Sequence, residues 1–256
     1  MVARPPLQRR ILYGLTGIAA TSGFWEAVAQ MSLYPVALLP PPSQSMTALG
    51  TAALSGRLAS DLMATAARYV IGLSLGTFFG LATGLLTASF ARLEMLVSPL
   101  FNYLRAIPLI ALLPIVLAVF GLSEFGKVAL VAWGAFFPIW IGTHMGIHGS
   151  SIDLAVVARS MGASRLLALI TVSVPSSMTS ILSAIRTALA TAFFALAAAE
   201  STGTQEGLIA RVFRSQALFD SKSMVAHLIL LGAVVLVVDG LYIGVTRRVF
   251  PWTLSA

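Results

Sequence analysis

The sequence predicts an all-α integral membrane protein with about six transmembrane helices. Two observations support this fold class. Of the 256 residues, 58% are hydrophobic and only 10% are charged, whereas a soluble domain usually carries about a quarter charged residues. Several apolar stretches also approach the roughly 20 residues that a helix needs to cross a bilayer. We therefore expect lipid, rather than water, to surround most of the chain.

The charge and cysteine content exclude several other classes. The 16 lysines and arginines outnumber the 9 acidic residues and give a net charge of +7, which is compatible with nucleic acid or anionic lipid as a partner. The hydrophobicity favours the lipid bilayer, so no nucleic-acid partner is expected. The chain contains no cysteine, and a disulfide, a thiolate metal site and a cysteine nucleophile are therefore excluded.

Six segments are the expected membrane spans, in chain order: Ile11–Ala29, Tyr69–Phe90, Leu96–Phe120, Val128–Ile147, Ser176–Ala199 and Met224–Val245. The first follows an arginine-containing segment, residues 1–10, and carries Glu26 near its far end. Before the second span, a Leu-Pro-Pro-Pro-Ser sequence at residues 39–43 predicts an extended turn, followed by an amphipathic helix that reaches about Ala67 outside the membrane. No separate soluble domain is visible, so residues 1–256 are expected to form a single transmembrane domain.

The third and fifth spans contain helix-breaking residues. Pro108 and Pro114 lie inside the third span, and proline removes a helix hydrogen bond, so a kinked or broken helix is expected. In the fifth span, Pro175 is followed by two serines and predicts a helix start. That start places Arg186 within the span, near an end where its side chain can reach the interface.

Loop charge predicts the orientation. With a cytoplasmic N-terminus, the inside segments hold Arg4, Arg9, Arg10, Arg92, Arg159, Arg165, Arg247 and Arg248. Fewer basic residues lie in the outside segments, which hold Arg57, Lys127, Arg211, Arg214 and Lys222. By the positive-inside rule, both termini, residues 1–10 and 246–256, and the loop 149–175 are expected in the cytoplasm.

Four glycines recur at every fourth position of the second span: Gly72, Gly76, Gly80 and Gly84. They leave one helix face without side chains, where another backbone can approach closely. Packing between helices is the interpretation that we favour. A contact with a second copy, or the lining of a pathway, remains an alternative.

Charged residues inside the expected spans are candidates for function, because a charge is retained in lipid only at an energetic cost. Arg105 and Glu200 are the strongest of these. They predict a polar pathway or gate for an anionic or zwitterionic solute. Anchoring at the membrane interface is the equal alternative.

Two weaker patterns predict no site. His144 and His148 have the spacing of a two-histidine metal pair, but a helix end at the membrane surface explains them equally well. Residues 121–128 approach a phosphate-binding loop, yet Val128 stands where a hydroxyl should ligate magnesium. Without a nucleophile motif as well, we expect no metal, no cofactor and no enzymatic activity in this chain.

The loop 149–175 contains the most informative motif. Ala158 and Gly162 are followed at the required spacing by Val172, Val174 and Pro175. This pattern resembles the cytoplasmic signature of the binding-protein-dependent ABC importer permeases, which runs E-A-A, three residues, G, nine residues, I-x-L-P. Val156 and Val157 depart from its opening Glu-Ala.

Further motifs extend the resemblance to the nitrate, sulfonate, taurine and bicarbonate branch of that family. They are the Leu-Pro-Pro-Pro-Ser turn at 39–43, Leu-Arg-Ala-Ile-Pro at 104–108, Leu-Leu-Pro at 112–114, Gly-Ala-Phe-Phe-Pro at 134–138 and Ala-Ala-Glu at 198–200. The resemblance implies the type I ABC importer permease fold in the inner membrane of a bacterium. It also implies a role for Arg105, Pro108 and Glu200 in the translocation path or gate.

The resemblance also implies partners. The permease is expected to act as a homodimer with a second copy, to receive a small solute from an extracytoplasmic binding protein, and to couple to two cytoplasmic subunits that bind ATP and magnesium. The residues expected to contact the ATPase are Ala158, Arg159, Gly162, Ala163, Ser164 and Pro175. A secondary transporter or channel that works without an ATPase is the alternative function; such carriers often contain inverted repeats.

Overall fold

The computed structural model describes residues 7–31, 34–35, 37–150 and 152–254. Within these ranges the chain forms helices and turns and no strand, which confirms the all-α class. The chain divides into two compact units. One combines the segment up to Leu62 with Leu208–Ala233, and the other combines Met63–Gly207 with the segment from Val234 onward. Parts of the expected cytoplasmic segments, residues 1–6, 151 and 255–256, lie outside the described residues.

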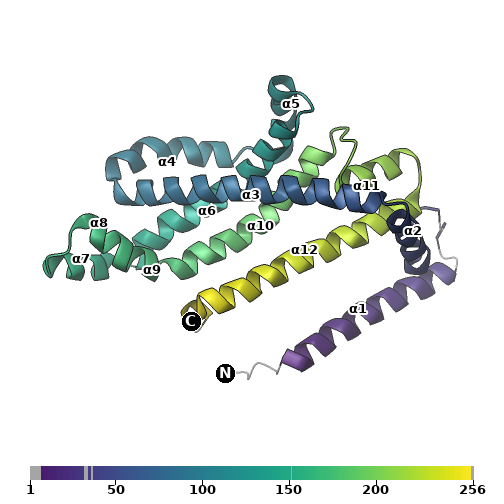
Figure 1. Cartoon of the computed structure of the whole chain (residues 1–256), viewed down its shortest axis with the longest axis horizontal. Coiled ribbons are helices and arrows are strands. Elements are labelled where there is room, and N and C mark those ends of the chain that lie inside the picture. The colour runs from purple at the N-terminus through teal and green to yellow at the C-terminus, as the bar shows by residue number, and fades with distance from the viewer. Residues whose placement is uncertain (1–6, 32–33, 36, 151, 255–256) are drawn as a thin grey trace. The chain divides into compact units, whose positions relative to one another are not determined.

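The helices that concern the argument follow in chain order (Figure 1): α1 (Leu7–Gln30), α2 (Pro42–Leu54), α3 (Arg57–Ser89), α4 (Ala91–Arg105), α5 (Leu109–Phe120), α6 (Glu124–Ser150), α7 (Ile152–Ser160), α8 (Arg165–Ala168), α9 (Val174–Ser176), α10 (Met178–Glu200), α11 (Leu208–Ala217) and α12 (Ser221–Val249). A π-helical turn, η1 (Leu169–Ser173), joins α8 to α9, and a short 3₁₀ turn, η2 (Pro251–Leu254), follows α12.

Four of the described helices are long and apolar enough to cross a membrane: α3, α6, α10 and α12. The pair α4 and α5 adds a fifth span if it is counted as one, with a bend of 97° between the two helices (Figure 1). The break expected in the third span is therefore present, and it falls between Arg105 and Leu109. The first expected span forms helix α1, which is not among the candidate spans of the described chain.

The second span begins earlier than the sequence predicted. Helix α3 starts at Arg57, not near Tyr69, so the expected external helix is divided between α2 and the first turns of α3. The polar residues in those turns are paired: Asp61 accepts hydrogen bonds from Arg211 of α11 at 2.9 and 3.1 Å. Hydropathy alone cannot detect this pairing, so the charged residues before Tyr69 were not assigned to the same helix as the second span.

The unit that contains α1, α2 and α11 is held by polar contacts at helix ends. Glu26 of α1 accepts hydrogen bonds from the backbone N–H and the hydroxyl of Ser43 at 3.1 and 2.8 Å. At the start of α12, the Oδ1 atom of Asp220 accepts from the N–H of Ser223 at 3.1 Å. Hydrogen bonds from Ser223 lower the pKa of Asp220 below its ordinary value, which keeps the helix cap ionised.

In the larger unit, the glycine strip of α3 lies against α6. A Cβ atom added to Gly76 would lie 2.5 Å from the carbonyl oxygen of Ala132, and one added to Gly80 would lie 2.9 Å from the Cβ of Ile139. The side chains that face the four glycines in turn are Val131, Ala135, Ile139 and Thr143. Both sets advance by four residues, so α3 and α6 run parallel, with their backbones in close contact.

Helix α6 presents its own small residues to α10. Added Cβ atoms at Gly134 and Gly146 would meet the Cβ atoms of Ala195 and Ser180 at 2.8 and 2.9 Å. Here one series rises as the other falls, so α6 and α10 are antiparallel. Val131, Ala135 and Ile139 of α6 are completely buried, and α6 is therefore the centre of this unit.

The helix directions show how the chain returns across the unit. Because α3 and α6 run parallel, the bent pair α4 and α5 must lead back from the end of α3 to the start of α6. Arg186 of α10 pairs with Asp239 of α12, and the Tyr242 hydroxyl donates to the carbonyl of Leu182 at 2.6 Å. These contacts make α10 and α12 antiparallel, so α12 ends at the same end of the unit as α6.

We expect Gly80→Leu to destabilise the folded chain, because its side chain would have to enter the space that Ile139 and the Phe136 carbonyl occupy. Overpacking of this kind costs about 1–3 kcal/mol. The thermal midpoint in detergent, followed by size-exclusion chromatography, measures the loss. Gly240→Leu on α12 is the matched control, since nothing lies within 4 Å of an added Cβ atom there. Equal midpoints for the two variants would contradict the packing role of the strip.

Candidate functional site

The segment after α6 forms two short helices separated by a tight turn. Helix α7 ends with a C-terminal cap in which the N–H groups of Gly162 and Ala163 donate to the carbonyls of Arg159 and Ala158, each at 3.0 Å. Gly162 has a φ of +96°, a conformation that side chains disfavour, and it completes a Schellman motif. The sequence-predicted residues 158–163 are thus brought together in one turn.

Ser164 and Pro175 act at the two ends of the following segment. The Ser164 hydroxyl accepts a hydrogen bond from the N–H of Leu167 at 3.2 Å and caps α8. Pro175 lies in α9, directly after the π-helical turn η1, within a continuous helical stretch from Arg165 to Ser176. Helix α10 then begins at Met178, two residues after the predicted start at Ser176.

Apolar side chains are exposed along this segment. Met161, next to the turn glycine, is 84% exposed. Leu154, Val156, Val157, Leu166, Leu167 and Ile170 are exposed as well. Exposed large apolar residues lie here beside two basic residues, Arg159 and Arg165, which makes this segment a candidate interaction surface. We call the stretch from α7 to α8 the α7–α8 segment.

An open hollow of about 620 Å³ lies beside this segment. It is bordered by the last turns of α3 and α6, by α7 and by the start of α8, and its lining includes Leu86, His148, Val156, Arg159, Arg165 and Leu169. The hollow therefore places α7 and α8 next to the ends of two core helices.

Glu200 lies at the opposite end of the unit, in a buried ionic network. Its side chain is fully buried, and Arg68 of α3 approaches it at 2.9 Å. Thr65 donates a second hydrogen bond at 2.9 Å. The left-handed Gly207, with a φ of +141°, leaves the space that the carboxylate fills. Glu200 was predicted from the sequence, but Arg68 and Thr65 were not, because both precede the predicted second span.

The network continues to the start of α6. Arg68 also forms a bidentate pair with Glu124, at 2.6 and 2.9 Å, and Lys127 donates to Glu124 at 2.8 Å. Lys127 is the lysine of the sequence that approaches a phosphate-binding loop. Its ion pair with Glu124 gives this lysine a structural role at the start of α6.

Arg105 and Pro108 lie at the bend between α4 and α5, apart from this network. Pro108 provides the extended residue before α5, with a φ of −60° and a ψ of 133°. The exposed Arg105 donates to the side-chain oxygen of Asn102 at 2.9 Å. Among the described residues it has no carboxylate partner, whereas Arg68, Lys127 and Arg186 each pair with one. Arg105 is therefore available to an anion.

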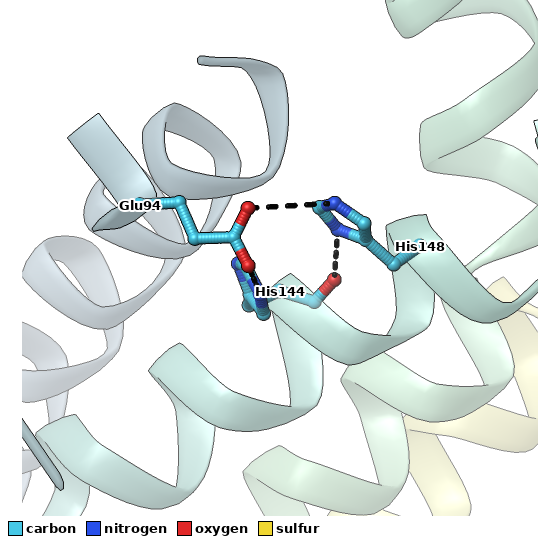
Figure 2. A group of neighbouring side chains, drawn as sticks. All are labelled: Glu94, His144 and His148. Atoms are coloured by element: carbon cyan, nitrogen blue, oxygen red, sulfur yellow. Dashed lines mark hydrogen bonds and ion pairs between the residues drawn. The ribbon is translucent and has the colours of Figure 1, made fainter. Parts of the chain in front are cut away.

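The two histidines of α6 meet a carboxylate that the sequence analysis did not connect with them. Figure 2 shows Glu94 of α4 directed toward His144 and His148. The distances from its two oxygens to the Nε2 atoms are 3.2 and 3.8 Å. Glu94 is distant in sequence, and nothing in the spacing of the histidines indicates it.

The family comparison decides what this arrangement belongs to. The family described as binding-protein-dependent transport system inner membrane component matches residues 76–251, a range that includes α4 to α10 and the whole α7–α8 segment. The chain belongs to this family. It is thus a permease, the membrane component of an importer, and ATP hydrolysis belongs to a separate subunit of such systems.

Individual relatives agree with the family. The permease is 28% identical over 99% of its length to a putative aliphatic sulfonates transport permease protein of Bacillus subtilis, and covers 93% of it. It is 34% identical to a formylaminopyrimidine transport permease protein of Halalkalibacterium halodurans, over 81% of this chain and 82% of the relative. The first of these confirms the resemblance to the sulfonate branch.

A solved structure confirms the fold. The permease matches a chain from the MetNI methionine ABC transporter in an inward-facing conformation, with a TM-score of 0.65 and 20% identity. The match covers 75% of this chain and 95% of the other. The type I ABC importer permease fold is therefore present, and the chain is a multi-pass protein of the inner membrane.

Proposed function

We propose that two copies of this permease line the translocation path of an importer for a small anion, and that the α7–α8 segment couples the path to ATP. Two cytoplasmic subunits bind ATP and magnesium, and an extracytoplasmic binding protein delivers the solute. The observation that carries this proposal is the exposed apolar surface of the α7–α8 segment, with its fixed turn at Gly162, inside the region that matches the family.

Coupling requires a rigid element between the ATPase and the membrane helices. The Schellman turn at Gly162 and the cap at Ser164 fix α7 and α8 relative to each other. Their exposed apolar side chains provide a docking face. The α7–α8 segment and the ends of α3 and α6 line the same hollow, so the segment lies next to these helix ends. In this proposal, Ala158, Arg159, Gly162, Ala163, Ser164 and Pro175 form or support the contact with the ATPase.

The orientation of the membrane helices is part of the proposal. The end of the larger unit at which α3, α6 and α12 finish carries Arg92, Arg159, Arg165, Arg247 and Arg248. At its opposite end, Lys127 is neutralised by Glu124. The positive-inside rule then supports a cytoplasmic position for the α7–α8 segment and for the C-terminus, and we extend it to the N-terminus.

For the solute we propose a small anion such as a sulfonate, taurine, nitrate or bicarbonate. The similarity to the aliphatic sulfonates permease supports this class. The guanidinium of Arg105, which has no carboxylate partner among the described residues, lies at the break that Pro108 introduces and supplies a positive group for such an anion. In this proposal, Glu200 belongs to the gate, where its ion pair with Arg68 holds it in one position.

Purification of the permease from its native membrane tests the proposal. We expect an ATP-binding subunit to co-purify. Reconstituted vesicles should take up a sulfonate only when ATP is present on the side of the membrane that carries the α7–α8 segment and the binding protein is also present. If the vesicles take up formylaminopyrimidine instead of sulfonates, the proposed anionic solute is wrong, whereas the proposed importer function stands. Uptake by the permease alone, without an ATPase, would establish the secondary transporter or channel.

A further inference from the structure

Three potential ligand atoms converge where α4 meets the last turns of α6. The carboxylate oxygens of Glu94 and the Nε2 atoms of His144 and His148 provide them (Figure 2). One ligand atom from each residue lies within 4.8 Å of the others. The two histidines are one helical turn apart on the same face of α6, and their rings lie 4.6 Å apart.

The hydrogen bonds of Thr87 hold the ring of His144 in place. The buried Thr87 hydroxyl donates its one hydrogen to the carbonyl of Thr83 at 2.8 Å. A second carbonyl, that of Gly84, lies 3.2 Å from the hydroxyl. The Nε1–H of Trp140 donates to the hydroxyl oxygen at 3.2 Å, and Nδ1 of His144 lies 3.1 Å from it. While the hydroxyl hydrogen is on a carbonyl, Nδ1 of His144 donates to Thr87, and Nε2 of the neutral ring presents its lone pair toward Glu94.

His148 is fixed in the same way. Its Nδ1 atom lies 3.3 Å from the carbonyl oxygen of His144, which only accepts hydrogen bonds, so this nitrogen also carries the proton. A metal-binding histidine usually donates its other N–H to a carbonyl or another acceptor, which orients the ring. Both histidines already have such a partner, and both direct Nε2 toward the carboxylate.

Two lone pairs and a carboxylate repel one another unless a positive charge lies between them. A proton on either Nε2 atom pairs one ring with the carboxylate, whereas a metal ion contacts all three groups. We propose that Glu94, His144 and His148 bind one divalent transition-metal ion of the zinc class. Imidazole nitrogen together with a single carboxylate suits zinc and its neighbours, rather than magnesium or calcium, which prefer oxygen ligands.

The geometry is close to what such an ion requires. Metal–ligand distances of about 2.0–2.2 Å place the ligand atoms of a tetrahedral site about 3.3–3.6 Å apart, by geometry from the same distances. The Glu94–His144 distance is 3.2 Å, the Glu94–His148 distance is 3.8 Å, and the three ligand atoms lie within 4.8 Å of one another, so side-chain rotations must draw them together around an ion. Three protein ligands leave the fourth position to water.

Such an ion would link α4 to α6. His148 also borders the hollow beside the α7–α8 segment, so the site lies next to the surface that we propose for coupling. An ion that binds the folded chain and not the unfolded one raises its stability in proportion to the logarithm of the metal concentration. Thermal stabilisation is therefore a readout that does not depend on transport activity.

Metal binding can be measured on the full chain in detergent, purified without a histidine tag and stripped with a chelator. Titration with Co²⁺ should give visible absorption bands of a nitrogen- and oxygen-ligated ion at one ion per chain, and Zn²⁺ should displace it. We expect Glu94→Gln and His148→Gln to weaken binding by tenfold or more. The matched control is His227→Gln, because His227 donates to its own helix and should not affect the titration.

Variants at Thr87 separate a positioned site from chance binding. Thr87→Val removes the acceptor for His144 and should weaken metal binding at least tenfold, as loss of an orienting partner usually does. Thr87→Ser keeps the hydroxyl and should bind as the parent does. Absence of stoichiometric Co²⁺ or Zn²⁺ uptake, including the case in which His144 merely shares a proton with Glu94, would overturn the proposal. Equal binding by the parent and Glu94→Gln would also overturn it.

Discussion

Gly162→Asp is expected to abolish ATP-driven uptake while the chain still inserts and folds. Among the described residues, nothing lies within 4 Å of an added Cβ atom at Gly162, so internal packing there gives no reason for a loss. In the proposed coupling role of this segment, the effect comes instead from the partner side of the turn. A side chain there occupies a close-approach position, and its carboxylate loses water on docking, which costs at least a few kcal/mol when no partner compensates it.

The φ of +96° at Gly162 adds a second penalty. A residue with a side chain pays about 1–2 kcal/mol in a left-handed conformation, so the substitution also loosens the cap between α7 and α8. A loss of 1.4 kcal/mol already means a tenfold weaker association. Together the two effects should remove most of the ATPase from the purified complex, or leave hydrolysis without stimulation by loaded binding protein.

The matched control is Gly203→Asp. Gly203 also has a positive φ, +77°, and also has nothing within 4 Å of an added Cβ atom, but it lies in the loop after α10. Backbone strain is thus similar in the two variants, and only one is in the α7–α8 segment. Uptake, hydrolysis and subunit retention can be measured on the same vesicles. Normal uptake with stimulated hydrolysis by Gly162→Asp would remove the coupling role of this segment.

The sequence predicted the fold well where a local signal decided the structure. The proline at position 108 predicted the break between α4 and α5, since it cannot donate a helix hydrogen bond, and the bend of 97° lies there. The glycine repeat in α3 has a spacing that places all four glycines on one face, and that face lies against α6. Both features follow from the chain's own covalent chemistry.

Features that depend on pairing over long distances could not be read from the sequence. Hydropathy placed the start of the second span after Arg68, whereas α3 continues back to Arg57. In this extension Asp61 and Arg68 find partners in α11, α6 and α10. Glu94 was likewise missed as a partner of the two histidines. In each case the polar residue has no local motif, and only the helix packing brings it to its partner.

In the candidate site, too, residues in a local motif were predicted from the sequence, whereas features that depend on packing were not. Gly162 and Pro175 were predicted from a motif with fixed spacing, and the structure adds the hydrogen bonds of the turn. The exposed face around Met161 was not predicted, because exposure depends on how α7 packs. Arg105 and Glu200 were chosen as a pair of intramembrane charges, but their surroundings differ: one is exposed, and the other is fully buried.

The Arg68–Glu200 pair provides the second large effect. We expect Arg68→Met to destabilise the chain by about 3–5 kcal/mol, the usual cost of removing one partner from a buried ion pair. The cost is high because the Glu200 side chain is fully buried and Arg68 is its cationic partner at 2.9 Å. Arg68→Lys keeps the positive charge but not the fork that binds Glu124 in a bidentate manner, so an intermediate loss is expected.

A double-mutant cycle isolates the pair from the other effects of these substitutions. Glu200→Met alone should also destabilise, though less, because Arg68 keeps Glu124 as a partner. In Arg68→Met with Glu200→Met, no buried charge is left unpaired at this position, so the double variant should be more stable than the sum of the single losses predicts. Thermal midpoints in detergent, converted with a common unfolding entropy, give the four corners of the cycle. If the losses simply add, Arg68 and Glu200 do not stabilise each other, and the network does not hold α3, α6 and α10 together at this end of the permease.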